Sequence, residues 1–388
     1  MQSEENSNGM PRTGAKTVLV VLGATGHFGR RIARRLASET GVQLVLTSRQ
    51  QTAADELASE LQNNWPKGDI KGAVLDQHAE DFERRLAALQ PEIVLHTAGP
   101  YQGQDYRVAK ACIGCGSHYI DLADGRQFVQ EFGTLHEEAL QNDVLLVTGA
   151  STLPGLSSAV VQEMSAQFAT ISDIDVSIAP AHQTPRGAGT VAAVLSYCGK
   201  AHDVLENGRR ERRFGWQDLR LQRYPQLGRR LSGACDVPDL VLFPKYIQGL
   251  KTIRFHAALE AWWEQIALWL MAWAVRLRVI KNWARFTKGF QSLSRRLLWL
   301  GSDTGGMQIQ VAGTDPSGSE KKVTWNLLAR DNHGPEIPCS PALIIARRML
   351  AGSMQQRGAI HCFGLFDLSD FDREVSELSI EWAMEDKS

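Results

Sequence analysis

The sequence predicts an α/β fold, in which a Rossmann-type, doubly wound parallel sheet is followed by a second α+β domain with a Trp-rich helical insertion. Within the first 150 residues, short runs of Val, Ile and Leu alternate with helical patterns, as they do in a sheet with helices on both faces. The runs are apolar throughout, as expected of strands covered on both sides. With 388 residues, of which 43% are hydrophobic, the chain is long enough for two domains.

Six strands are expected in the first domain, at residues 17–22, 43–47, 70–75, 93–97, 118–122 and 144–148. Helical patterns lie between them, for example at 30–39 and 81–89. The rhythm then changes to a helix at 156–168, a strand at 174–179 and an antiparallel pair at 307–312 and 322–329, joined by the turn Asp315-Pro316-Ser317-Gly318. We therefore expect a disordered tail at 1–16, a first domain at 17–150 and a substrate or dimerisation domain at 151–388, with the helical insertion at about 256–300.

The charge and cysteine content exclude several classes of protein. The net charge is −1, so the chain lacks the general basic field of a nucleic-acid-binding protein, and no such partner is expected. Positive charge is concentrated in residues 200–299, with 19 Lys and Arg against 8 Asp and Glu, so an anionic partner is expected to meet this part. Six scattered cysteines, and an apolar run at 18–22 too short for a signal-peptide core, predict a cytoplasmic protein. Cys112 and Cys115 have no further ligands at metal-binding spacing, so no metal site is expected.

A glycine-rich loop follows the first strand directly, with the sequence Gly23-Ala24-Thr25-Gly26-His27-Phe28-Gly29. The first glycine permits a tight turn, the second lets backbone N–H groups approach a pyrophosphate, and the third lets the next helix pack close to the strand. The positive end of the helix dipole also favours phosphate. The loop, with its strand and helix, predicts a dinucleotide-binding site.

The end of the second strand discriminates between the two nicotinamide coenzymes. In NAD-binding proteins an acidic residue there binds the ribose 2′-hydroxyl, whereas this chain has Thr47-Ser48-Arg49. An arginine can pair with a 2′-phosphate, so the sequence predicts NADP with Ser48 and Arg49 as contacts. Asp76 is expected at the adenine edge, and the loop Ala98-Gly99-Pro100-Tyr101 is expected to face the nicotinamide. The alternative interpretations are a solvated arginine and an exposed loop aspartate.

Eight short motifs, in order along the chain, are similar to those of a known family. They are GATGHFG (23–29), AGPY (98–101), HYIDL (118–122), TLPG (152–155), RGAGT (186–190), GSDTGGM (301–307), WNLLA (325–329) and GPEIP (334–338). Together they resemble the saccharopine dehydrogenase-like oxidoreductases, including their uncharacterised bacterial branch and its trans-acting enoyl reductases. The resemblance implies an NADP-dependent oxidoreductase with a smaller α+β second domain. It also places the YxD stretch near the substrate, which makes Tyr119 and Asp121 the leading catalytic residues.

Hydride transfer to a polarised double bond needs a positioned acceptor and a proton donor. Tyr101, Tyr119, Asp121 and Asp124 follow the fourth and fifth strands, where they can border a cleft between the domains. The residues expected to contact the substrate are Asp124, Arg186 and Thr190. Arg186 and Thr190 match a family pattern and are expected to bind an anionic group of the substrate. The alternative roles are helix caps and loop hydrogen bonds.

A rival motif lies at Tyr106-Arg107-Val108-Ala109-Lys110, which matches the YxxxK of short-chain dehydrogenases. In those enzymes the pair lies after the fifth strand, whereas here it follows the fourth. We therefore interpret it as a chance match.

A Trp-rich, basic stretch lies between residues 257 and 300 and holds six of the ten tryptophans. Only Glu260 and Glu264 offset its seven cations, which are Arg276, Arg278, Lys281, Arg285, Lys288, Arg295 and Arg296. Apolar residues recur there at helical spacing. Two interpretations stay open: residues 257–299 contact a membrane interface or a lipid-like ligand, or they pack on the second domain or on a second copy in a homodimer.

Three functions are compatible with these patterns. The first is an NADP-dependent reductase of a hydrophobic or lipid-linked small molecule, cytoplasmic and in peripheral contact with the inner face of the membrane. The second is a non-catalytic NADP(H)-binding sensor or scaffold at the membrane surface. The third is an amino-acid dehydrogenase acting on saccharopine, which the Trp-rich segment disfavours because compact enzymes of lysine metabolism lack it.

Overall fold

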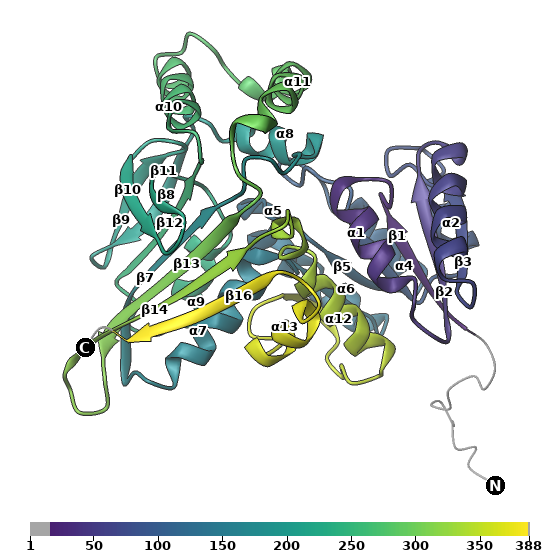
Figure 1. The fold of residues 1–388 in the computed structure, drawn as a ribbon. Helices are drawn as coiled ribbons and strands as arrows, with labels where there is room; N and C mark the ends of the chain where they lie inside the picture. The colour runs from purple at the N-terminus through teal and green to yellow at the C-terminus, as the bar shows by residue number, and fades with distance from the viewer. Residues whose placement is uncertain (1–15, 387–388) are drawn as a thin grey trace, which may run out of the picture.

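The first sheet has seven strands that all pair in parallel (Figure 1). The computed structural model describes residues 16–386, so the expected tail lies outside the described residues except for Lys16. The strand order is β15-β6-β5-β4-β1-β2-β3, and the winding reverses between β1 and β4, where open sheets of this kind bind ligands. The strands are β1 (Thr17–Leu22), β2 (Val42–Ser48), β3 (Asp69–Val74), β4 (Ile93–His96), β5 (His118–Asp121), β6 (Leu145–Thr148) and β15 (Gly358–His361). The predicted Rossmann-type sheet is confirmed.

Helices cover both faces of this sheet because its strands alternate side chains between two apolar clusters. In β1, Leu19 and Val21 pack with α1 and α2 on one face, while Val20 and Leu22 pack with α3, α4 and α5 on the other. In α1 the buried residues recur at spacings of three and four, which is the period of one helix face. The connecting helices are α1 (His27–Leu36), α2 (Gln51–Asn64), α3 (Phe82–Ala88), α4 (Arg107–Gly114), α5 (Arg126–Glu131), the 3-10 turn η1 (Phe132–Leu135) and α6 (His136–Gln141).

The C-terminal part of the chain returns to the first sheet. β15 pairs with β6, and α12 (Ser340–Leu350) packs against both α1 and α13 (Leu368–Val375). The sequence did not predict β15, since its four residues carry no distinct alternation of apolar and polar side chains. Because β15 lies within the segment 151–388, the predicted boundary near residue 150 stays a prediction.

The second sheet also has seven strands, in the order β10-β11-β12-β7-β13-β14-β16. Only β7 and β12 pair in parallel, and the other pairs are antiparallel. The predicted strand at 174–179 and the predicted hairpin are present, and the side chain of Asp315 accepts the Ser317 and Ser319 N–H groups in the turn. The strands are β7 (Thr170–Ala179), β10 (Arg220–Tyr224), β11 (Gly228–Ala234), β12 (Thr252–Ala258), β13 (Gly305–Thr314), β14 (Glu320–Ala329) and β16 (Ile380–Asp386), with a separate hairpin of β8 (Ala201–Glu206) and β9 (Arg209–Phe214).

Helices of the second domain lie around this sheet, and Figure 1 shows α8, α10 and α11 at one end of it. They are the π-helical turn η2 (Thr152–Leu156), α7 (Ser157–Ser165), α8 (Ala188–Ser196), α9 (Asp239–Tyr246), α10 (Trp262–Arg276), the turn η3 (Trp283–Phe286), α11 (Thr287–Leu297), the turn η4 (Leu298–Leu300) and the turn η5 (Gly334–Glu336). The predicted insertion is helical, although its first residues belong to β12. No helix within residues 16–386 combines the length and apolarity that crossing a membrane requires.

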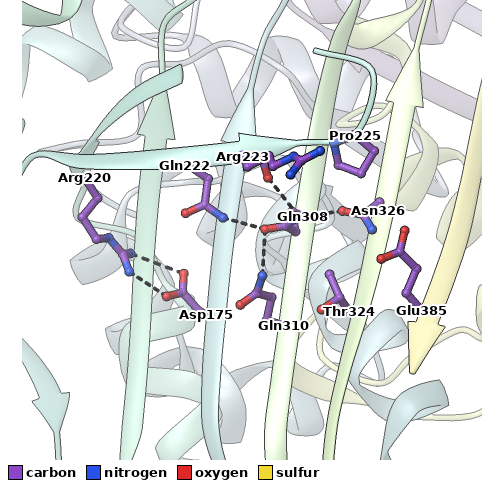
Figure 2. A pocket seen from close by; sticks show the side chains of 10 residues that line it. All are labelled: Asp175, Arg220, Gln222, Arg223, Pro225, Gln308, Gln310, Thr324, Asn326 and Glu385. Carbon is purple, nitrogen blue, oxygen red and sulfur yellow. Dashed lines mark hydrogen bonds and ion pairs between the residues drawn. The ribbon is translucent and has the colours of Figure 1, made fainter. Parts of the chain in front are cut away.

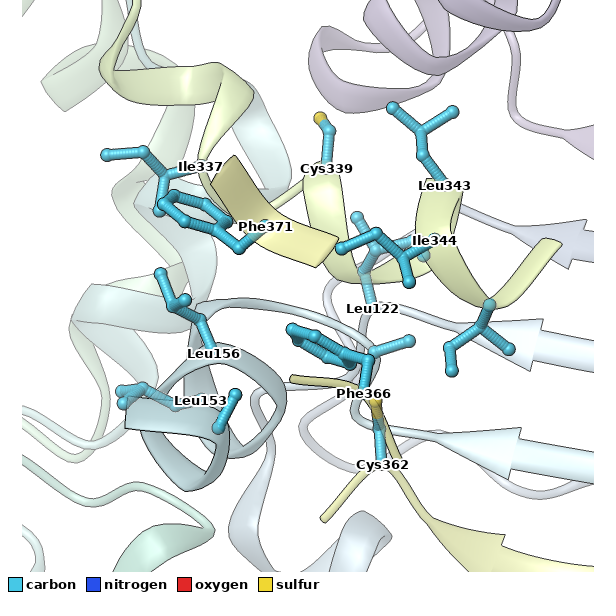
Figure 3. Packing of buried hydrophobic residues seen from close by; sticks show 14 of the residues in the cluster. Leu122, Leu153, Leu156, Ile337, Cys339, Leu343, Ile344, Cys362, Phe366 and Phe371 are labelled. Carbon is cyan, nitrogen blue, oxygen red and sulfur yellow. The ribbon is translucent and has the colours of Figure 1, made fainter. Parts of the chain in front are cut away.

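The two sheets are joined by a continuous apolar cluster (Figure 3). Leu122 follows β5, Leu153 and Leu156 come from η2, and Phe366 and Phe371 come from the C-terminal segment. All are buried, so these segments, far apart in sequence, hold the second domain against the carboxyl ends of the first sheet. That junction is where a ligand bound to the first sheet would meet the second domain.

Candidate active site

The glycine-rich loop makes a tight turn between β1 and α1. Gly23 has a φ of +82°, in the left-handed region that glycine adopts without strain. A Cβ added at Gly29 would lie 2.6 Å from Thr97 Oγ1 and would overlap the carbonyl oxygen of Gly23. The close approach of α1 to the end of β4 therefore requires glycine at position 29.

The N-terminus of α1 presents unpaired backbone N–H groups to the crevice above the sheet. Gly26 is its N-cap and supplies no capping side chain. Within the described chain, the N–H groups of His27, Phe28 and Gly29 have no backbone acceptor. Three N–H donors at a positive helix end form a site for a pyrophosphate, so the residues present fit a dinucleotide.

The end of β2 lies beside this loop. Ala24 N–H donates to Thr47 O at 3.0 Å, and the Thr25 hydroxyl donates to Ser48 Oγ at 3.4 Å. Arg49 comes next and is exposed, and in residues 16–386 its guanidinium has neither an ion pair nor a hydrogen bond. A free guanidinium at this position suits a 2′-phosphate.

The loops after β3 and β4 are fixed by their own side chains. Asp76 Oδ1 accepts the His78 N–H at 3.0 Å, so one carboxylate oxygen shapes the loop in which it lies. Tyr101 is buried, and its hydroxyl donates to His96 O at 2.6 Å. The Tyr101 ring therefore points into the domain, in contrast to the expectation that it faces the nicotinamide. Ala98, Gly99 and Pro100 remain at the crevice, where a Cβ at Gly189 of α8 would lie 3.4 Å from the backbone of Gly99.

Tyr119 is fully buried beneath these loops. Its hydroxyl lies 2.9 Å from His96 Nδ1, and His96 Nε2 lies 2.9 Å from Gln77 Oε1. Burial lowers the pKa of His96 to about 3 and raises that of Tyr119 well above its ordinary value, so both are neutral near pH 7. This buried chain of hydrogen bonds holds β4 and β5 together. The catalytic role of Tyr119 stays a prediction, and its burial argues against contact with substrate.

Asp121 is also fully buried, at the end of β5. Its Oδ1 accepts hydrogen bonds from Ala123 N–H at 2.9 Å, from the Thr148 hydroxyl at 3.0 Å and from Gly149 N–H at 2.8 Å. Burial raises its pKa to about 6, and these hydrogen bonds oppose the rise. Asp121 thus ties the end of β5 to the end of β6, which is a positioning role. A catalytic role for it stays a prediction.

An apolar cavity of about 450 Å³ lies beside the glycine-rich loop. His27 and Phe28 of α1 form its end next to the expected cofactor position. The second sheet supplies one wall, and α8, α10 and α11 supply the other. Its apolar lining includes Ile178, Val191, Val194, Leu195, Trp216, Phe255, Leu268, Met271, Phe290, Leu297 and Met307. A chamber of this kind suits an elongated hydrophobic molecule.

All three expected substrate residues, Asp124, Arg186 and Thr190, lie on the wall of this cavity. The structure thereby brings them together with His27 and Phe28 of the cofactor loop. Arg186 Nη2 is buried and has no hydrogen-bond partner in the described chain. Burial lowers the pKa of Arg186, and the charge of Glu264, also on the wall, opposes this shift. A buried guanidinium group with a free donor can bind an anionic group strongly.

Two further ionisable groups lie on the cavity wall near the first sheet. Burial, together with the charge of Arg31, lowers the pKa of His27 to about 4, so His27 is neutral near pH 7 and is a poor proton donor. Asp124 Oδ1 accepts the Gln102 side-chain N–H at 3.1 Å. Partial desolvation raises the pKa of Asp124, and the hydrogen bond from Gln102 opposes the rise, while the residue remains exposed to solvent. Asp124 is therefore a carboxyl group that meets whatever occupies this space.

Sequence reasoning missed most of the cavity wall. Thr152 and Leu153 of the TLPG motif and Pro335 and Ile337 of the GPEIP motif line it, but these motifs carried a family resemblance without a role. The available signal was that each motif lies a few residues after the end of a strand, β6 for TLPG and β14 for GPEIP. The apolar wall residues gave none, because buried core and cavity wall look alike in a sequence.

A second cavity, of about 560 Å³, lies on the opposite face of the second sheet and is polar (Figure 2). Gln222 donates to Gln308 Oε1 at 2.5 Å, and Gln308 donates to Asn326 Oδ1 at 2.7 Å. Arg220 pairs with Asp175 at 2.8 Å across the same space. This cavity holds no residue that the sequence predicts for the site, and it is remote from the glycine-rich loop.

The remaining motifs do not assemble a site. The Tyr106 hydroxyl donates to Phe128 O at 2.8 Å, and Lys110 is exposed on α4. Cys112 is buried and Cys115 hydrogen-bonds the Ala111 carbonyl. Within residues 16–386 no cluster of His, Cys, Asp and Glu is arranged to hold a metal ion.

Residues 19–147 match the saccharopine dehydrogenase NADP binding domain family. They form a saccharopine dehydrogenase NADP-binding domain. The predicted cofactor, NADP, is thereby confirmed, as is the resemblance to this family; the assignment to its bacterial branch stays a prediction. The match and the fold together support an NADP-dependent oxidoreductase.

Comparisons with single proteins extend this result to the fold of the whole chain. Apo saccharopine dehydrogenase (L-Glu forming) from Saccharomyces cerevisiae is similar with a TM-score of 0.67, covering 96% of this chain and 100% of that chain at 11% identity. At such identity the similarity concerns the fold alone. The very-long-chain 3-oxoacyl-CoA reductase of Podospora anserina is 37% identical over 89 residues, which are 21% of this chain and 26% of that protein. The chain therefore spans about a quarter of the length of this curated relative.

Proposed function

We propose that this saccharopine dehydrogenase-like protein is an NADP-dependent reductase of a hydrophobic or lipid-linked substrate that lies in the apolar cavity. One observation carries the proposal: a single cavity begins at His27 and Phe28 of the cofactor loop and continues between the second sheet and α8, α10 and α11. The substrate of the Podospora relative, a very-long-chain acyl thioester by its name, is of the same chemical class. A peripheral contact with the inner face of a membrane is a separate proposal and is argued below.

Bound along the glycine-rich loop, NADPH would supply the hydride that reduces a polarised double bond. The N–H groups at the start of α1 bind the pyrophosphate, and Arg49 binds the 2′-phosphate. The apolar wall of the cavity surrounds the hydrophobic part of the substrate. Asp124 is the carboxyl group on the wall of the end next to this loop, and we assign it as the proton donor to the reduced substrate.

Arg186 and Thr190 bind an anionic or polar group of the substrate in this proposal. Thr190 lies in the first turn of α8 and Arg186 lies just before its N-cap, Gly187, where the helix N–H groups add partial positive charge. Substrates with a carboxylate or thioester-linked anionic carrier therefore fit better than neutral hydrocarbons. We expect Arg186→Gln to raise the KM for an anionic substrate about tenfold or more and to leave NADPH binding unchanged.

Turnover with acyl substrates of graded chain length tests the proposal. Purified protein and NADPH are mixed with 2-enoyl and 3-oxoacyl thioesters from short to long chains, and the loss of NADPH absorbance is followed. We expect kcat/KM to rise with chain length. The variant Val194→Phe, which narrows the cavity, is expected to raise the KM for long chains about tenfold and to leave short chains unaffected.

Two other outcomes separate the rival functions. NADPH binding without oxidation of any of these substrates would support the non-catalytic sensor or scaffold. Oxidation of saccharopine with NADP, together with indifference to acyl chains, would support the amino-acid dehydrogenase. The apolar lining of the cavity favours neither the sensor or scaffold nor the amino-acid dehydrogenase.

A further inference from the structure

The outer surface of α10 to η4 is unusually apolar for an exposed part of a protein. Nine of the thirteen large apolar side chains that are exposed in the described chain lie there: Trp262, Trp263, Leu270, Leu277, Val279, Phe286, Leu293, Trp299 and Leu300. Trp262 is 68% and Trp299 75% exposed. An exposed apolar surface of this density marks a contact with a partner or a membrane.

The charges around this surface are of one sign. All seven cations between Arg276 and Arg296 are exposed, and none forms an ion pair in residues 16–386. Arg276 alone has a further partner among aromatic rings, over Phe214 and Trp273. Between Trp262 and Leu300 the only acidic residue is Glu264, which faces the cavity. The surface is therefore complementary to a partner that is both apolar and anionic.

The same helices form the outer wall of the apolar cavity. Trp263 and Ala267 of α10, and Leu293 of α11, line the cavity and are also exposed to solvent. The cavity thus reaches the surface between α10 and α11. In α10 and α11 together, only Gln265 and Ala272 are buried. Few side chains therefore anchor these two helices to the body of the protein.

We propose that α10 and α11 dock on an anionic lipid bilayer and that the apolar substrate enters the cavity between them, directly from the bilayer. Aromatic side chains favour the headgroup region, and cations next to them favour anionic lipid. A second copy of the chain fits less well, since a two-fold contact would place each set of cations against another set. The route of entry rests on the proposed function, whereas the docking does not.

Flotation with vesicles tests the docking. The full chain is mixed with vesicles of phosphatidylcholine alone or of phosphatidylcholine with phosphatidylglycerol, and the bound fraction is measured. We expect binding only to the anionic vesicles and a loss of binding at high salt. Equal binding to both vesicles, or none to either, would overturn the proposal, and a stable dimer that buries these tryptophans would identify a second copy as the occupant.

Matched variants assign the binding to this surface. Each cation near a membrane strengthens partitioning about fivefold, so Arg278→Gln with Lys281→Gln should weaken it about 25-fold. The control removes two exposed lysines of the first domain, Lys67→Gln with Lys110→Gln, and should have little effect. Trp262→Ser with Trp299→Ser should also weaken binding, whereas Trp65→Ser, at a tryptophan that is 44% exposed elsewhere, should not.

Substrate delivery tests the route of entry and separates its failure from that of the proposed function. A long-chain acyl substrate is offered either in anionic vesicles or dispersed in detergent. We expect the Arg278→Gln and Lys281→Gln variant to lose NADPH oxidation with vesicles and to retain it with detergent. If the variant and the parent oxidised NADPH at equal rates with vesicles as well as with detergent, the route of entry would be overturned. If neither protein oxidised NADPH with either substrate preparation, the proposed function would be overturned.

Discussion

The two halves of the candidate site are built by different means. The cofactor half is one continuous loop, and it offers backbone N–H groups whose access depends on three glycines. The substrate half is assembled from side chains of the second sheet, of three helices and of segments that follow strands of the first sheet, all far apart in the sequence. In the cofactor half, one added side-chain atom is enough to prevent binding. In the substrate half, no single apolar residue is essential for binding. The comparison predicts a hierarchy of mutational effects.

The largest effect is expected in the cofactor half, at Gly29. In Gly29→Val the new side chain would overlap the Gly23 carbonyl and Thr97 Oγ1, so α1 has to move away from the strand. We expect the variant to lose about 3 kcal/mol of stability and all measurable NADPH binding. Isothermal titration and chemical denaturation measure the two.

A glycine with open surroundings is the control for Gly29. In Gly114→Ala, at the end of α4, the added Cβ meets nothing within 4 Å, and the helix gains a better helix former. We expect normal NADPH binding and unchanged or slightly higher stability. Comparable losses in both variants would contradict the special role of Gly29.

The next effect is expected outside both halves, at Asp239 of α9, which packs between elements of the two sheets. This carboxyl group begins α9, which packs on η2, and neither of its oxygens has a hydrogen-bond partner in the described chain. Burial raises its pKa from 3.8 to about 7. Above about pH 4, Asp239 is ionised in the unfolded chain, so folding requires it to take up a proton or to bury its charge. The free-energy cost of doing so grows with pH until about pH 7.

Removal of that charge should stabilise the protein in a way that depends on pH. We expect Asp239→Asn to unfold at a higher denaturant concentration than the parent at pH 7, by on the order of 3 kcal/mol, and to lose this advantage near pH 4. Urea titrations at several pH values measure the difference. An advantage that is constant with pH would show that Asp239 is not neutral in the folded protein.

The sequence predicts the cofactor half of the site better than the substrate half. The first six strands and the cofactor loop are visible because their signals are local: a run of apolar residues, then glycines at fixed spacing. Tyr119 and Asp121 share a strand end with Asp124, but sequence cannot show that the first two turn into the core and the third into the cavity. Neither β15 nor the apolar part of the cavity wall was predicted, since both depend on contacts between segments that are distant in the chain.

A smaller effect, confined to one ligand, is expected at Arg49. Its exposed guanidinium has no protein partner in residues 16–386, so its loss should cost little stability. We expect Arg49→Gln to weaken NADPH binding by about 2 kcal/mol and to leave NADH binding unchanged. Titration with both coenzymes measures the ratio. An equal loss for both would place Arg49 away from the 2′-phosphate.

The smallest effect is expected in the substrate half, where side chains border empty space. Val194 lies on α8 and faces the cavity, whereas Val160 on α7 is fully buried. Because the cavity already exists, Val194→Ala removes few packing contacts and should cost less than about 1 kcal/mol, against about 2 kcal/mol for Val160→Ala. The same Val194→Ala change should alter the affinity for Nile red, a neutral apolar dye, which Val160→Ala leaves unchanged. If the two variants lost equal stability, the space beside α8 would be closed in solution, and the substrate half of the site would lie elsewhere.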